Sequence, residues 1–202
     1  MTATTSPLTD LKIIVPKQFA DDRGFFLETW NRAAYESQDI PAHMVQDNLS
    51  WSRRGVLRGL HYQWPNPQGK LVYVLSGEIF DVAVDIRVGS PTFGAWAGFT
   101  LSSADMRQLY IPPGYAHGFC VVSEEALVAY KCTERYHAEC DANLAWDDPD
   151  VGIEWPIDSP ILSDKDRLAP RLRDISEARL PRDHADSPAG LNGSHGRVVR
   201  PR

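Results

Sequence analysis

The chain has 202 residues, of which 43% are hydrophobic and 24% are charged. This composition is that of an ordinary globular protein, and the length suits one domain with a substantial core, or one domain and a tail. The formal net charge of −6 disfavours nucleic acid as the main partner, because phosphate backbones are bound by basic surfaces. No apolar run approaches the roughly 20 residues of a membrane span, which argues against a membrane partner.

The cysteines and the N-terminal residues indicate a compartment. Cys120, Cys132 and Cys140 are too few for a disulfide framework, and their spacings fit no zinc motif. The N-terminal residues contain neither the basic region nor the apolar region of a signal peptide. We therefore expect reduced thiols and a cytoplasmic location.

Short runs rich in β-branched and aromatic residues recur along the chain, and turn-forming residues separate them. In chain order we expect strands at 11–15, 70–75, 78–86, 96–101, 107–111, 116–122 and 126–131. A short helix is predicted over 31–38 and a turn over 102–105. Many short strands with few helices predict an all-β sandwich or barrel.

The run 78–86 shows how such a strand is used. Phe80, Val82 and Val84 alternate with Asp81 and Asp85, so that apolar side chains share one face. That pattern predicts one face in a core, with the other facing solvent, a cavity or a partner.

The composition changes near the C-terminus. From residue 180 the chain is rich in Pro, Gly, Asp, His and Arg and has almost no apolar periodicity. We therefore expect a single domain over residues 1–172, followed by a polar, mobile tail over 173–202.

Three cationic or titratable side chains fall within the segment 55–70, which otherwise reads as buried strand. They are Arg58, His61 and Lys70. A sheet interior disfavours such groups unless they face a pocket, so this segment predicts a ligand site. Strand alternation points Arg58 and His61 to opposite faces, and only a local bend brings them together. The turn at Gln68 and Gly69 predicts hairpin pairing that places Lys70 beside His61.

A metal site fits this segment poorly. Small β-barrel metalloenzymes often use a His-x-His pair, but Gln63 stands at the second position of the pair. Glu78 and His117 would complete only a weak divalent-metal site, with Lys70 close by. We therefore expect no metal, and the chain also has no Gly-rich dinucleotide or Walker loop.

Other candidate side chains have equally good structural interpretations. His117 follows a Pro-x-Gly turn, Tyr130 lies within a strand, and Asp166 lies within a run of charges. Arg23 precedes Gly-Phe-Phe, which suits either an anion and a planar base or a charged turn before a strand. The run Gln46, Asp47 and Asn48 (46–48) suits either a sugar or uracil-type ring, or a turn.

Taken in series, these motifs resemble one family, the dTDP-4-dehydrorhamnose 3,5-epimerases of the cupin superfamily. Each motif alone is weak, but nine in the same order and spacing are specific. They lie at residues 21–26, 46–50, 55–61, 68–70, 80–87, 89–94, 111–119, 130–131 and 162–166. The resemblance covers roughly residues 10 to 172. It implies a cupin-type jelly-roll β-sandwich, used as a homodimer in which the neighbouring subunit's N-terminal segment completes the site.

The resemblance also implies an activity and its residues. The expected reaction is cofactor-free epimerisation at C3 and C5 of dTDP-4-dehydro-6-deoxy-D-glucose, giving dTDP-4-dehydro-L-rhamnose. His61 would be the base, Asp166 its orienting carboxylate, Lys70 the cation near the C4 oxygen, and Tyr130 the acid on the other side. Asp47 stays a substrate-binding candidate with its neighbours in the run 46–48. Lys70 is implied both as this catalytic cation and as a substrate-binding residue. The other implied substrate-binding positions are Arg23, Glu28, Gln46, Asn48, Arg58, His117, Tyr136, Asp141 and Lys165.

The sequence alone leaves three rival functions open. A sibling epimerase would invert only C3 or only C5 of a related dTDP-4-keto-6-deoxysugar, with the same catalytic residues. A non-catalytic nucleotide-sugar-binding cupin would keep the pocket without the chemistry. A metal-dependent cupin isomerase or dioxygenase would lose its activity after chelation.

Overall fold

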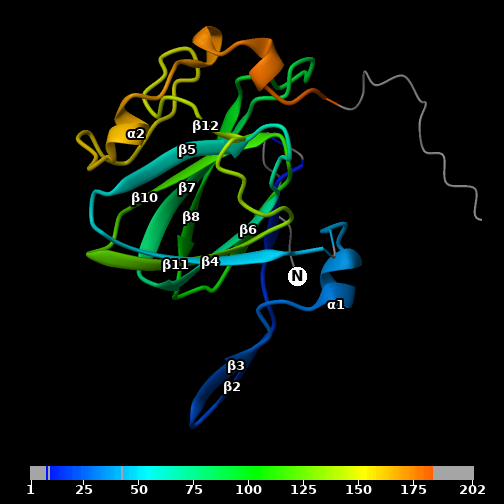
Figure 1. Ribbon diagram of the computed structural model, residues 1–202. Coiled ribbons are helices and arrows are strands. Elements are labelled where there is room, and N and C mark those ends of the chain that lie inside the picture. Colours follow the sequence, from blue (N-terminus) through cyan, green and yellow to red (C-terminus); the bar gives the residue numbers. More distant parts are fainter. Residues whose placement is uncertain (1–7, 9, 42, 184–202) are drawn as a thin grey trace, which may run out of the picture.

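The computed structural model describes residues 8, 10–41 and 43–183 as two five-stranded antiparallel sheets stacked face to face (Figure 1). From β5 onward the chain passes repeatedly between the two sheets, as a jelly roll requires, which confirms the predicted all-β sandwich. The first sheet has the order β1 (Lys12–Ile14), β9 (Gln108–Ile111), β6 (Lys70–Ser76), β11 (Glu125–Cys132) and β4 (Gln46–Arg53). The second has the order β12 (Asp141–Asn143), β5 (Leu57–Gln63), β10 (Tyr115–Val121), β7 (Glu78–Asp85) and β8 (Trp96–Ser102).

An apolar core fills the space between the sheets. Val72 of β6, Leu109 of β9 and Val128 of β11 pack there against Ile79 of β7 and Phe119 of β10. The first four of these side chains are fully buried, and Phe119 is nearly so. Complete burial of each such side chain contributes about 1.5–3 kcal/mol relative to its exposure to water.

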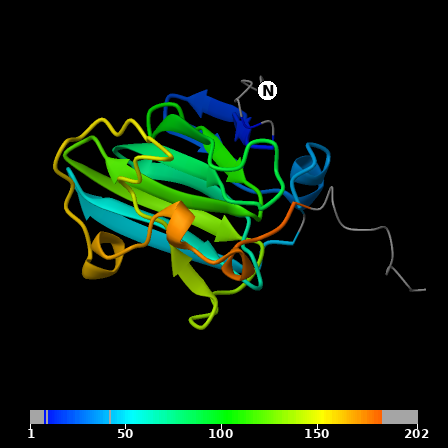
Figure 2. The same cartoon turned by 90° about the horizontal axis from the view of Figure 1, so that it is seen from above.

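The outer face of the second sheet carries another core. Val82 and Val84 of β7 pack there against Leu144, Leu172 and Leu180. Figure 2 shows this C-terminal segment, drawn in yellow and orange, crossing the strands of the second sheet. Both faces of β7 are therefore covered, one by the opposite sheet and the other by the returning chain.

The predicted boundary at residue 172 lies inside this packed C-terminal segment. Two short 3₁₀ helices, Leu172–Asp174 and Glu177–Arg179, continue beyond it, and Leu180 is 3% exposed. The amide of Val88 also donates to the carbonyl of Pro181 at 2.8 Å. Isolated apolar residues anchor this segment without periodicity, which is why composition alone misplaced the boundary. The rest of the predicted tail, 184–202, lies outside the described residues.

Helices are few and short. α1 (Arg32–Glu36) begins at Asn31, whose side chain accepts a hydrogen bond from the amide of Ala34, and it confirms the predicted helix. α2 (Asp164–Arg167) begins at Ser163 in the same way. Within the described residues, no helix is long enough and apolar enough to cross a membrane.

One hairpin extends away from the sandwich. β2 (Gln18–Asp21) and β3 (Gly24–Leu27) pair only with each other and project from the body (Figure 1). Phe19, Phe25 and Phe26 are more than half exposed on it. A two-stranded hairpin with exposed aromatic side chains is marginal by itself in water.

A bulge in β5 shapes the wall of the cavity. His61 pairs with His117 of β10, whereas Arg58 pairs with Phe119, so three residues of β5 span the distance of two on β10. Gly59 lies in this bulge with φ +118°. A Cβ at this position would lie 2.6 Å from the Cα of Gly118, which only glycine avoids.

We expect Gly59→Ala to destabilise the protein by about 2–4 kcal/mol, because the methyl group would force β5 and β10 apart. Gly55→Ala is the matched control, since Gly55 has φ +80° but open space at its Cβ position. Denaturant unfolding measures both losses. Equal losses for the two variants would show that the contact with β10 is unimportant.

Candidate active site

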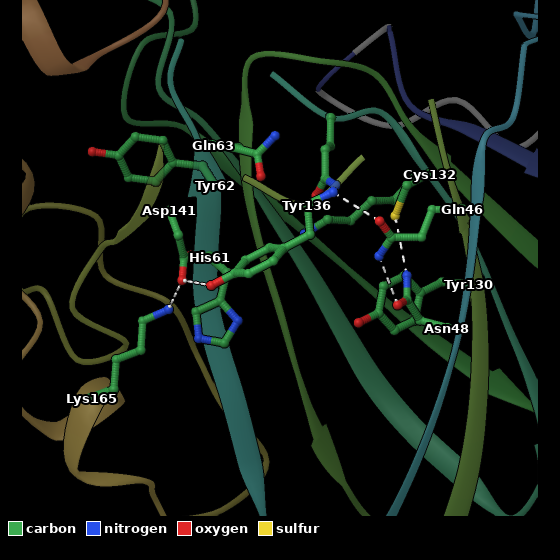
Figure 3. A pocket seen from close by; sticks show the side chains of 12 residues that line it. Gln46, Asn48, His61, Tyr62, Gln63, Tyr130, Cys132, Tyr136, Asp141 and Lys165 are labelled. Atoms are coloured by element: carbon green, nitrogen blue, oxygen red, sulfur yellow. Dashed lines mark hydrogen bonds and ion pairs between the residues drawn. The ribbon is translucent and has the colours of Figure 1, made fainter. Parts of the chain in front are cut away.

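A cavity lies between the two sheets and has two lobes that share three side chains. The first lobe, of about 370 Å³, and the second lobe, of about 360 Å³, are both lined by His61, Lys70 and Tyr130. These volumes fall in the usual range for small-molecule sites, roughly 300–1,000 Å³. Figure 3 shows the side chains of the first lobe.

His61 and Asp166 form a hydrogen-bonded pair on the wall made by the second sheet. His61 Nε2 lies 2.6 Å from Asp166 Oδ1, and Asp166 is 4% exposed. Burial tends to raise the pKa of Asp166, but the hydrogen bond and charge of His61, together with hydrogen bonds from Ser163 and the Gly59 amide, outweigh it and lower this pKa. An ionised carboxylate in this position fixes the tautomer and the orientation of the imidazole.

The bulge at Gly59 turns Arg58 toward the cavity. The guanidinium lines the second lobe, where Arg58 Nε donates to Ser52 Oγ at 2.9 Å. Strand alternation alone places Arg58 and His61 on opposite faces, and the extra residue in β5 reverses this. The predicted local bend is therefore confirmed.

Lys70 reaches the cavity by a different route from the one predicted. It begins β6, which belongs to the first sheet and pairs with β9 and β11, so it does not pair with β5 in a hairpin. The residues that follow His61 leave the second sheet and cross to the first, so Lys70 approaches His61 from the opposite wall. The side-chain ammonium of Lys70 makes no hydrogen bond or ion pair with the described residues, and burial lowers its pKa.

Tyr130 also comes from the first sheet. It lies on β11 opposite Asn48 of β4 and Val72 of β6. Burial is the main cause that raises the pKa of its phenol, so the hydroxyl stays protonated at neutral pH. The cavity therefore has an imidazole on one wall, and a phenol and an ammonium on the other.

The first lobe continues into a rim of hydrogen-bonding side chains (Figure 3). Gln46 accepts from the amide of Tyr136 and donates to Asn48 Oδ1 at 2.9 Å. Asp141 accepts from the hydroxyl of Tyr136 at 2.9 Å and pairs with Lys165. These five side chains offer an aromatic face, amide groups and one ammonium to a bound molecule.

His117, which lines the second lobe, belongs to a second imidazole–carboxylate pair. His117 Nε2 lies 2.9 Å from Asp81 Oδ2, and both residues are buried. Burial is the main cause that lowers the pKa of His117. Asp81 opposes this change, whereas Lys70 and His61 add to it. A neutral imidazole in this place is suited to hydrogen bonding with a ligand.

Three of the predicted substrate-binding residues do not line the cavity within the described chain. Asp47 faces outward, where its side chain is 70% exposed and pairs with Lys131, because Gln46 and Asn48 occupy the inward positions of β4. Asp47 therefore lies outside the described cavity lining, and its contact with a ligand stays a prediction. Arg23 lies at the tip of the projecting hairpin, paired with Asp21, and Glu28 is exposed at its base.

Some cavity residues escaped the sequence prediction. Cys132 lines the first lobe and accepts a hydrogen bond from Asn48 Nδ2 at 3.5 Å. Its place two residues after Tyr130 was a usable signal, because alternate residues of a strand share a face. Asp81 lies outside the lining of both lobes but bonds to His117, a pairing that nothing in the sequence indicates.

The model of the dTDP-4-dehydrorhamnose 3,5-epimerase family matches residues 5–174. The chain belongs to this family. It is 53% identical over 165 residues to the dTDP-4-dehydrorhamnose 3,5-epimerase of Methanothermobacter thermautotrophicus, across 80% of this chain and 89% of that protein. The family relationship confirms the resemblance inferred from the nine motifs, and the jelly-roll sandwich is of the cupin type.

Structural similarity and a further relative agree with this membership. A crystal structure of dTDP-6-deoxy-D-glucose-3,5-epimerase from Legionella pneumophila, in complex with dTDP-4-keto-L-rhamnose, has a TM-score of 0.88 and 50% identity. The match covers 90% of this chain and 98% of that one. A dTDP-4-dehydrorhamnose 3-epimerase from Streptomyces niveus is 40% identical over 169 residues, across 83% of this chain and 82% of that protein. The family therefore includes enzymes named for one inversion as well as for two.

We expect Lys70→Met to stabilise the folded protein by about 1–3 kcal/mol, because an apolar side chain replaces a half-buried cation that lacks an ion-pair partner. The pKa of Lys70 is lower in the folded chain than its ordinary value of 10.5, so the unfolded chain holds more protons between the two values. The free energy of unfolding of the wild type should therefore rise relative to that of the variant as pH increases through that interval. Denaturant unfolding at several pH values measures this, and a less stable variant at neutral pH would contradict it.

Proposed function

We propose that this protein is a cofactor-independent epimerase that inverts C3 and C5 of dTDP-4-dehydro-6-deoxy-D-glucose, giving dTDP-4-dehydro-L-rhamnose. Family membership supports the reaction class, and the names of the relatives at 53% and 50% identity support the substrate. One observation carries the mechanism: His61 and Tyr130 stand on opposite walls of one cavity that Lys70 also lines.

The reaction uses the acidity that a ketone gives to its neighbours. C3 and C5 both flank the C4 ketone, so a proton removed from either carbon leaves an enolate whose charge lies on the C4 oxygen. His61, held by Asp166, accepts that proton, and the charge of Lys70 stabilises the enolate oxygen. Tyr130 then donates a proton to the same carbon from the other face of the ring, which inverts the centre. Base and acid on opposite walls are what an inversion needs.

The remaining cavity side chains suit the rest of the substrate. In the first lobe Tyr136 offers a ring for stacking on thymine, with Gln46 and Asn48 as hydrogen-bonding partners and Lys165 as a charge for the diphosphate. In the second lobe Arg58 and His117 suit the sugar or the diphosphate. Asp141 would contribute mainly by holding Tyr136 and Lys165.

The first test follows solvent deuterium into the sugar by NMR. Epimerisation in D₂O should label both C3 and C5, because each centre loses a proton to His61 and regains one from an exchangeable group. Label at one carbon only would favour the single-site activity for which the Streptomyces niveus relative is named.

Two variants separate catalysis from binding in the same assay. His61→Ala should abolish exchange at both carbons with little loss of nucleotide affinity. Tyr130→Phe should slow net inversion by about 100-fold or more, while exchange without inversion continues, because the His61 imidazolium can exchange the abstracted proton for solvent deuterium and return deuterium to the same face. Unchanged exchange in His61→Ala would rule out His61 as the base. No exchange in the wild type would leave only a nucleotide-sugar-binding protein, and loss of activity after chelation would point to a metal-dependent cupin.

We also propose a homodimer in which Arg23 and Glu28 of one subunit complete the cavity of the other. The exposed aromatic side chains of the β2–β3 hairpin support this, since they have no partner surface within the described chain. The edge strand β4 offers such a surface, because Leu49 and Trp51 are exposed on it beside the second lobe.

Within the cell, three reduced cysteines favour the cytoplasm as the site of action.

Subunit exchange tests this arrangement. Arg23→Ala and His61→Ala should each be nearly inactive alone, because each lacks one part of every site. After unfolding and refolding together, mixed dimers contain one intact site, so the mixture should recover about a quarter of the wild-type activity. Each variant refolded alone is the control. No recovery in a mixture proven to contain mixed dimers would contradict a site shared between subunits.

A further inference from the structure

Two neighbouring side chains of the short helix α2 contact two different strands of the second sheet. Lys165 pairs with Asp141 on β12, whereas Asp166 holds His61 on β5. A helix of four residues has no stability of its own in water, so contacts with the sheet must define where α2 lies. The orientation of the imidazole depends on this placement, because Asp166 can hold His61 only from a fixed backbone.

Asn143 supplies such a contact. It is the last residue of β12, directly opposite His61 in the ladder between β5 and β12. Its side-chain Nδ2 donates to the carbonyl of Lys165 at 3.3 Å, which is the carbonyl of the peptide bond that joins Lys165 to Asp166.

These contacts close a ring. One side is the β-ladder from His61 to Asn143, the next is the hydrogen bond from Asn143 to the peptide before Asp166, and the last is the 2.6 Å bond from Asp166 back to His61. Ser163 also accepts from the amide of Asp166 at 3.2 Å, but Ser163 belongs to the same segment as α2 and cannot tie it to the sheet. Within the described chain, Asn143 is therefore the side chain that joins the backbone of α2 to the strand beside His61.

The side-chain oxygen of Asn143 argues against a purely stabilising role for this residue. Asn143 is 8% exposed, and its Oδ1 is buried without a hydrogen-bond partner among the described residues. A buried acceptor without a partner destabilises a fold, so an apolar side chain of the same shape would suit stability better. The contact to the peptide of α2 is what distinguishes asparagine from such a side chain.

We infer that Asn143 is a positioning residue: it fixes the backbone of α2 so that Asp166 holds the imidazole of His61 in its reactive orientation. This inference rests on the proposed epimerase function for its kinetic effect. Its structural content concerns the His61–Asp166 pair alone, which can be examined without any substrate.

The test replaces Asn143 by leucine, which has a similar shape but no hydrogen-bonding groups, and separately by alanine. Both variants should lower kcat about 10-fold or more, with KM within about twofold, because a small displacement of a catalytic group slows the chemical step and leaves binding intact. Asn143→Leu should nevertheless melt no lower than the wild type. Asn31→Ala is the matched control, since it removes an asparagine contact at α1, away from the cavity.

NMR of the substrate-free protein gives a second readout. The proton between His61 and Asp166 should give a low-field signal that His61→Ala removes, and both Asn143 variants should broaden or shift it while Asn31→Ala leaves it unchanged. An unaltered signal together with wild-type kcat in Asn143→Leu would overturn the inference, as would a loss of kcat that only follows a fall in melting temperature. If Asn143→Leu does not fold, Asn143→Ala decides on the same two readouts. If the wild type shows no epimerisation, the proposed function fails, while the NMR signal still decides the role of Asn143.

Discussion

The unpaired ammonium of Lys70 inside the sandwich is the constraint on which the rest of the site depends. An apolar side chain in place of Lys70 would make the folded protein more stable, because burial disfavours the charged form and the described chain supplies no ion-pair partner. Everything around it keeps the cavity polar: the imidazole of His61 on the facing wall, the phenol of Tyr130 beside it, and the His117–Asp81 pair below. The apolar core occupies the rest of the space between the sheets, so the cavity is a local departure from ordinary sandwich packing. Such a departure is understandable where a negative charge must develop on a bound molecule.

Much of this arrangement follows from the sequence. Alternating short strands with Gly and Pro turns define the sandwich, and a charged cluster within strand-like residues marks the cavity. The roles of Tyr130 and Asp166 needed the family resemblance, because a tyrosine in a strand and an aspartate in a charge run have no distinguishing local pattern. Their proximity to His61 is a long-range property, since 105 residues separate His61 from Asp166.

The differences between prediction and structure each have a local cause. Lys70 follows a turn that resembles a hairpin, but the chain uses it to change sheets, and no local signal separates these outcomes. Asp47 was predicted to bind the substrate because of its polar neighbours, but strand alternation directs its side chain outward. The packed segment after residue 172 relies on isolated apolar residues such as Leu180, which have no periodicity to detect. Asn143 could not be found at all, because its importance comes from a cross-strand neighbour and a backbone carbonyl.

The arrangement of base and acid about the sugar ring is the centre of this account. A crystal structure with a dTDP-linked hexose in the cavity would test it most directly. We predict His61 and Tyr130 on opposite faces of the ring, each within proton-transfer reach of the carbons beside C4, with Lys70 directed at the oxygen on C4. A complex with both side chains on one face of the ring, or with the sugar held outside the two sheets, would contradict it.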